Sequence, residues 1–161
     1  MNEQEIHHLL YDIPENVDYT DIPQDLDLED VSKERVDKLR DLLHSDDLAV
    51  RFDAALLLTN WGVEDGLNTL IDLFEKGETK GFIPHHLHPY DDTNKHILDA
   101  LIGYWASQTD LHKEQEARKR IYPTIISIIK QAVHSSYSIA QIGFLIKKDL
   151  DIHKEVYTEY I

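Results

Sequence analysis

The segment 41–75 constrains the fold most strongly, because two amphipathic helical patterns stand there on either side of one glycine. In the first pattern, apolar residues recur at i, i+4, i+7, i+8 and i+11 and form one stripe: Val50, Ala54, Leu57, Leu58 and Trp61. The second pattern repeats the i, i+3, i+4, i+7 spacing with Leu67, Leu70, Ile71 and Phe74. Gly62 between them favours the left-handed conformation that closes a helix. Neither helix could bury its apolar face alone, so the segment predicts a hairpin that stacks on further helices.

The order of residues within this hairpin is also informative. An acidic cap (Asp46 and Asp47) precedes Val50-Arg51, a small pair (Ala54 and Ala55) and a leucine run that ends at Trp61-Gly62. This order resembles one unit of a HEAT-like repeat, the helical-hairpin repeat of many scaffold proteins. The resemblance implies a binding surface rather than a catalyst, and it implies that Arg51 ties neighbouring repeats together through acidic or carbonyl groups. We therefore expect Arg51, Ala54 and Ala55 to be stacking residues and not ligands.

Further helical patterns flank the hairpin. Ser32 is a good N-cap for a helix that ends near Ser45, and Thr93 can cap a helix that reaches Trp105. A longer helix is expected over 114–133, with Pro123 starting or kinking its apolar half, and a last pair over 139–146 and 152–160. No strand pattern appears. The sequence predicts one all-α domain over 1–161: about seven helices in a short right-handed α-solenoid of about three HEAT-like hairpins.

The charge of the chain is concentrated at its beginning. The net charge is −15, and residues 1–30, the acidic leader, hold ten acidic residues and no Lys or Arg. Residues 31–161 hold 21 acidic and 16 basic residues, which is close to balance. A solvated, partly disordered arm is one interpretation of the leader. The other is that the leader packs partly on the repeats with its carboxylates outward, because it also contains many apolar side chains.

Composition excludes several classes of protein and site. The absence of cysteine excludes disulfides and thiolate ligands and fits a reducing compartment. No apolar run reaches the ~18 residues that a membrane span requires, and residues 1–11 lack the basic region of a signal peptide. A cytoplasmic protein is expected. The negative field repels nucleic acid and anionic membranes and attracts basic partners.

The segment 77–92 is the longest irregular stretch and contains most of the residues that could carry chemistry. His85, His86 and His88, together with Asp91, Asp92 and the following His96, include reasonable zinc ligands. Their spacing is poor, because adjacent histidines point in different directions in most backbones. We expect no metal and no cofactor here. Long loops in compact domains are often functional, and Tyr90 is a good contact residue since it combines area with a polar tip.

No catalytic motif is present. The chain lacks a Gly-rich phosphate loop, a Gly-x-Ser-x-Gly elbow and a cysteine nucleophile. Trp61 and Trp105 end apolar stripes and are expected in the core. The only basic cluster contains Lys113, Arg118, Lys119 and Arg120. It is either a solvated helix face or a dock for the acidic leader.

These observations favour a non-enzymatic module that binds a basic protein. Small, acidic, cysteine-free proteins with HEAT-like repeats look like bacterial immunity proteins, which neutralise cytoplasmic toxins such as basic nucleases; the resemblance implies that role. A general adaptor or assembly scaffold is the alternative, and a helical-repeat enzyme, such as a lyase or DNA glycosylase, is a third class that the charge and the missing motifs disfavour. The expected contact residues are in the leader and the loop: Asp18, Asp21, Asp25, Asp27, Tyr90, Asp91 and Asp92.

Overall fold

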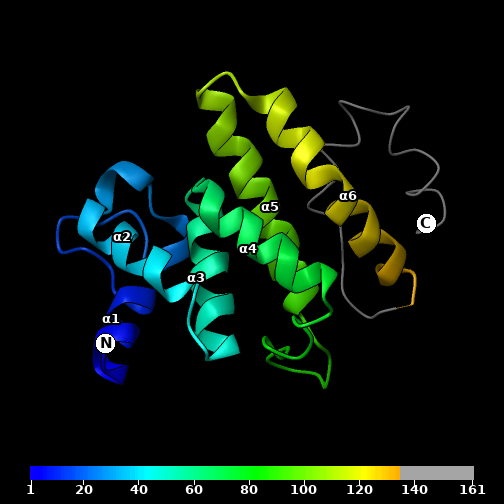
Figure 1. Cartoon of the computed structure of the whole chain (residues 1–161), viewed down its shortest axis with the longest axis horizontal. Coiled ribbons are helices and arrows are strands. Elements are labelled where there is room, and N and C mark those ends of the chain that lie inside the picture. The colour runs from blue at the N-terminus through cyan, green and yellow to red at the C-terminus, as the bar shows by residue number, and fades with distance from the viewer. Residues whose placement is uncertain (135–161) are drawn as a thin grey trace.

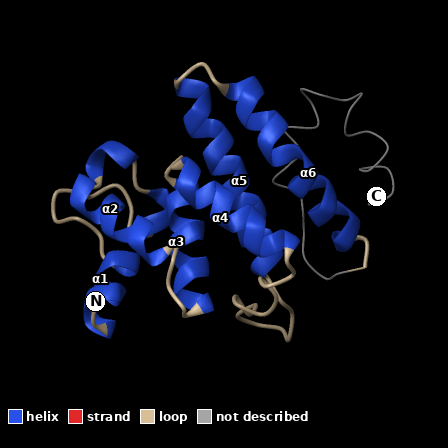
Figure 2. Ribbon diagram, in the orientation of Figure 1, coloured by secondary structure: helices blue, strands red, loops and turns tan. Residues whose placement is uncertain are grey.

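The computed structural model describes residues 1–134, and this part of the chain is built from helices without a named strand (Figures 1 and 2). The six α-helices are α1 (Glu3–Tyr11), α2 (Lys33–Leu42), α3 (Leu48–Asn60), α4 (Glu64–Glu75), α5 (Thr93–Asp110) and α6 (Glu114–Ala132). Two short 3-10 turns, η1 (Pro23–Asp25) and η2 (Leu28–Asp30), lie between α1 and α2. Over residues 1–134 the all-α prediction is confirmed. The predicted helices at 139–146 and 152–160 lie outside the described residues.

Local sequence signals set several of the helix ends. The Ser32 side chain accepts a hydrogen bond from the Arg35 amide, which confirms that predicted cap. Of the two acidic candidates Asp46 and Asp47, Asp47 is the cap, since its carboxylate accepts from the amides of Ala49 and Val50. Gly62 closes α3 with a φ of 78°, a left-handed conformation that favours glycine. These ends agree with the sequence because capping depends on side chains a few residues away.

Helix α3 is the centre of the structure. Its last nine residues include seven buried ones, Phe52, Ala54, Ala55, Leu56, Leu57, Leu58 and Thr59, and they are distributed around the helix. The prediction of a single apolar stripe is therefore wrong for α3. A helix that is apolar on most sides must be covered on most sides, and α1, α2, α4, α5 and η1 all pack against α3. Helix α6 covers the other face of α5 (Figure 1).

Glycine allows helix α4 to approach α3 closely. A Cβ atom added to Gly66 would lie 2.5 Å from the Leu58 Cβ and 3.0 Å from the Ala55 carbonyl oxygen. On α5, the contact is looser: a Cβ at Gly103 would lie 3.3 Å from the Asn60 side-chain oxygen. The backbones of α3 and α4 thus touch at a point where only glycine fits.

The acidic leader is attached to the helices mainly through backbone carbonyls. The Trp61 indole N–H donates to the Pro23 carbonyl (2.8 Å). The Arg35 guanidinium donates to the carbonyls of Leu9 and Asp12, both at 2.8 Å, and lies over the Trp61 ring. Leu10 and Leu26 are buried in the core. One guanidinium and one indole therefore connect the leader to α2 and α3.

Two further features differ from the sequence prediction. Thr93 does not cap α5: the N-cap position is Asp92, and Thr93 is the first helical residue, fully buried. Its hydroxyl instead donates to Asp91 and accepts a hydrogen bond from the Ile83 amide (2.9 Å). Helix α1, which begins with a capping box between Asn2 and Glu5, was not predicted at all. Helix α6 runs from Glu114 to Ala132 with Pro123 inside it, at an exposed position.

Among the described helices, none combines the length and apolar character needed to cross a lipid bilayer.

The contact at Gly66 generates a stability prediction. Gly66→Ala should destabilise the protein by about 1–3 kcal/mol, because overpacking at the α3–α4 crossing outweighs the ~1 kcal/mol that alanine gains in a helix. Gly103→Ala is the matched control, since the same exchange on α5 meets no contact under 3.3 Å, and it should cost less stability than Gly66→Ala. Urea denaturation measures both variants. Equal stability of Gly66→Ala and wild type would contradict the close approach.

Candidate functional site

The four leader carboxylates predicted to contact a partner are all on the surface. Asp18, Asp21, Asp25 and Asp27 are exposed, and within residues 1–134 none of their side chains has a hydrogen-bond or ion-pair partner. Tyr19 draws the two parts of the leader together: its hydroxyl accepts from the Asp27 amide and donates to the Asp30 carboxylate, each at 2.9 Å. The result is a fixed segment that carries unneutralised negative charge outward.

A groove separates this segment from the turn between α5 and α6. It has a volume of about 450 Å³ and is lined by Leu26–Glu29, by Asn60–Gly62 and by Ser107, Gln108, Asp110 and Leu111. We call it the leader groove. Its charged residues are all acidic (Asp27, Glu29 and Asp110), and its apolar rim contains Leu28 and Leu111, which are 43% and 60% exposed. An acidic groove with exposed leucines suits a basic segment that also carries an apolar side chain.

The loop 77–92 lies at the other end of α5. That helix begins at Thr93, directly after the loop, and its last turn lines the leader groove. Because α5 has 18 residues, the two ends are about 27 Å apart. Figure 1 shows the loop below the helices and the α5–α6 turn above them. The structure therefore does not bring the predicted loop contacts together with the leader groove.

The two aspartates of the loop have internal roles. The Asp91 carboxylate accepts hydrogen bonds from the amide of Gly81 (2.8 Å), the amide of Thr93 (3.0 Å) and the Thr93 hydroxyl. Burial opposes ionisation, but these hydrogen bonds outweigh it and lower the pKa of Asp91 below its ordinary value. Asp92 is buried at the start of α5. Of the three predicted loop contacts, only Tyr90, 39% exposed, presents its side chain to solvent without such a bond.

The histidines of the loop form a ring cluster. His85 stacks on His88 at 5.3 Å between ring centroids, and its Nδ1 accepts a hydrogen bond from the Leu87 amide (3.1 Å). The loop is also attached to α3, because Phe82 stacks on Phe52 at 4.8 Å. In residues 1–134 no three His, Asp or Glu side chains are placed to hold a metal ion together.

Three residues were expected to stack repeats. Ala54 and Ala55 are fully buried on α3. The Arg51 guanidinium donates twice to the Ser45 carbonyl, with a distance of 2.9 Å for Nε. Arg51 thus ties the start of α3 to the turn that precedes it, within one hairpin.

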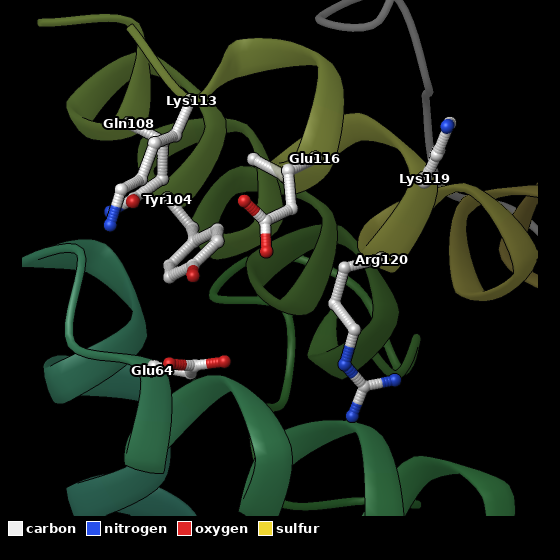
Figure 3. A pocket seen from close by; sticks show the side chains of 8 residues that line it. Glu64, Tyr104, Gln108, Lys113, Glu116, Lys119 and Arg120 are labelled. Atoms are coloured by element: carbon white, nitrogen blue, oxygen red, sulfur yellow. The ribbon is translucent and has the colours of Figure 1, made fainter. Parts of the chain in front are cut away.

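A second pocket, lined by charged residues, was not foreseen. It has a volume of about 310 Å³ and lies where α4 begins, beside the last turns of α5 and the first turns of α6. Figure 3 shows the Tyr104 hydroxyl between the carboxylates of Glu64 and Glu116. Burial and these two carboxylates raise the pKa of Tyr104. The sequence carries no signal for this pocket, because Tyr104 continues the apolar face of α5 and glutamates are common in the first turn of any helix.

Lys113, Lys119 and Arg120 of the predicted basic cluster line this pocket. In the described part of the chain no ion pair joins these three residues to the leader carboxylates. Arg120 instead donates to the Asn68 side chain on α4 (2.9 Å).

Comparisons with protein-family models, with curated proteins and with solved structures give no match to this chain.

The hydrogen bonds of Asp91 generate a pH prediction. Since the pKa of Asp91 is lowered in the folded state, its stabilising contribution is present above the unfolded value of about 3.9 and is lost as the pH falls through the folded value. Asp91→Asn should therefore be less stable than wild type at pH 7, and the difference should shrink towards pH 2–3. Thermal denaturation across this range measures it. Asp46→Asn, an exposed carboxylate outside the loop, should show no such difference, and a constant deficit for Asp91→Asn would exclude the ionised carboxylate as the cause.

The loop histidines generate a prediction for metal removal. Because their ring nitrogens do not converge on one point with a third ligand, the melting temperature should be the same in EDTA and in buffer. Metal analysis of the purified protein gives a second readout. Stoichiometric zinc, or a fall of many degrees in EDTA, would contradict the prediction.

Proposed function

We propose that this chain is a non-enzymatic module that binds a basic protein through its acidic leader. One observation carries the proposal: the leader is held against α2 and α3, yet Asp18, Asp21, Asp25 and Asp27 are all exposed with no partner inside residues 1–134. Unneutralised charge of one sign destabilises a compact protein by self-repulsion. A fixed array of such charges is best explained by a partner that neutralises it.

The leader groove adds shape to this charge. Leu28 and Leu111 on its rim offer apolar contact, and Asp27, Glu29 and Asp110 surround them with negative charge. Apolar contacts at the centre of an interface supply affinity, whereas charges at its rim accelerate association. We place the main contact at the leader groove and a separate contact at Tyr90. The two are too far apart for one small segment of the partner to reach both.

The more specific role that we propose is that of an immunity protein for a basic toxin. It rests on the resemblance of residues 41–75 to a HEAT-like repeat, on the acidic charge and on the lack of cysteine. In this proposal the helices form a short α-solenoid, the site of action is the cytoplasm, and the carboxylates occupy the positions that phosphates would take on a nuclease. Loss of the captured partner's enzymatic activity on binding would separate this role from that of an adaptor.

The electrostatic proposal is tested by comparing two variants that lose the same number of negative charges, one from the leader and one from another surface. Asp18, Asp21, Asp25 and Asp27 are changed together to Asn, and the matched control changes Asp41 and Asp46 to Asn and Glu75 and Glu78 to Gln. All eight positions are exposed, and both variants have a net charge of −11 in place of −15. The partner is first captured from lysate, and its association rate with each variant is then measured at several salt concentrations.

The leader variant should associate at least ~10-fold more slowly at low salt, and its rate should depend less on salt, because local charges steer the encounter and are screened beyond ~8 Å at physiological ionic strength. The control variant should stay close to wild type. Equal slowing of both variants would mean that only net charge matters. An unchanged rate for the leader variant would exclude the leader as the contact.

A further inference from the structure

The pocket at Tyr104 contains a phenol hydroxyl with no partner among the described residues. Tyr104 is only 6% exposed, and its hydroxyl makes no hydrogen bond to any described residue. The hydroxyl faces the pocket between α4, α5 and α6 (Figure 3). Because the hydroxyl opens into the pocket and has no competing partner among the described residues, it is available to a ligand.

Two carboxylates face the same space. Glu64 in the first turn of α4 and Glu116 in the first turn of α6 point towards Tyr104 from opposite sides (Figure 3). Within residues 1–134 neither carboxylate has a hydrogen-bond or ion-pair partner. The positive ends of two helices make it less costly to hold these charges close together. The pocket therefore presents three acceptor groups, two carboxylates and one phenol hydroxyl, around one small space.

The basic residues of the rim do not neutralise these carboxylates. Arg120 is turned towards α4, where it donates to Asn68 (2.9 Å). Lys119 points away from Tyr104 (Figure 3). Three cationic side chains also line the pocket. At the hydroxyl itself, burial and the two carboxylates outweigh Arg120 and raise the pKa of Tyr104.

We propose that this pocket binds a guanidinium group, the head of an arginine side chain. A guanidinium is planar and has five N–H donors in a fixed fork, so one group can donate to two carboxylates and to a phenol oxygen at once. A carboxylate–guanidinium pair makes short, charge-assisted hydrogen bonds, about twice as strong as neutral ones. The pocket is small enough to take such a head group and too small for a folded element.

The site is independent of the leader, but it lies next to it. Gln108 lines both the Tyr104 pocket and the leader groove, and it donates to the Gly62 carbonyl between them (3.2 Å). An arginine of a basic partner seated in the groove could reach the pocket. Guanidinium binding is nevertheless inferred from the geometry of the pocket alone and does not depend on the proposed function.

Acetyl-arginine-amide is the probe that tests this inference, and acetyl-citrulline-amide is its uncharged counterpart of nearly the same shape. Heteronuclear NMR titration should show saturable shifts at residues around Tyr104 with the arginine probe, with an affinity of millimolar order, and at least ~10-fold weaker binding of the citrulline probe. Glu64→Gln and Glu116→Gln should each weaken the arginine probe by about 10-fold. Tyr104→Phe should weaken it by a smaller factor.

Glu75→Gln, an exposed carboxylate on α4 outside the pocket, is the matched control and should leave the affinity unchanged. Circular dichroism and melting temperature show whether each variant is folded. Equal binding of the two probes, or arginine binding that survives both glutamate exchanges, would overturn the inference. Inorganic phosphate shifting the same resonances more strongly than the arginine probe would also overturn it, and would identify an anion site made by the basic residues.

Discussion

The rest of the structure depends on the burial of α3. Its apolar and small residues occupy most of its circumference, so it is stable only when other helices surround it. Five elements meet that requirement, and the closest approach is permitted by Gly66, where a Cβ would collide with α3. The dependence is mutual, because α4 and α5 bury their own apolar faces on α3. The outer helices, and therefore the side chains that they carry, take their places by packing on α3.

The leader is held by a different kind of interaction. Its attachment relies mainly on carbonyl oxygens, which accept hydrogen bonds from Arg35 and Trp61, and leaves the carboxylates of Asp18, Asp21, Asp25 and Asp27 uninvolved. If ion pairs held the leader instead, its negative charge would be neutralised within the protein. Backbone attachment preserves that charge for the surface, where it sets the field beside the leader groove. The structure thus separates the groups that stabilise the leader from those that a partner could recognise.

The aspartates of the loop 77–92 and those of the leader differ in the same way: the first are used inside the structure and the second face outward. In the loop 77–92, the Asp91 carboxylate accepts hydrogen bonds from Gly81 and Thr93, and Asp92 is buried. In the leader, comparable aspartates are exposed. Sequence cannot tell these cases apart, because an aspartate beside a helix start and an aspartate in an arm have the same local composition. Only the position of neighbouring amides decides which carboxylate is engaged.

Sequence by itself determined the helices α2 to α6, the cap at Ser32 and an acidic cap at Asp46 or Asp47, because periodicity and capping act over a few residues. It also determined the acidic charge of the leader. It did not determine α1, the burial of α3 on several sides or the position of Thr93 as a buried first-turn residue. Tertiary structure alone decided that Glu64, Tyr104 and Glu116 share one pocket and that the leader and the loop lie at opposite ends of α5. These juxtapositions join residues about 10 to 80 positions apart in the chain, and they are fixed by helix packing, which no local pattern encodes.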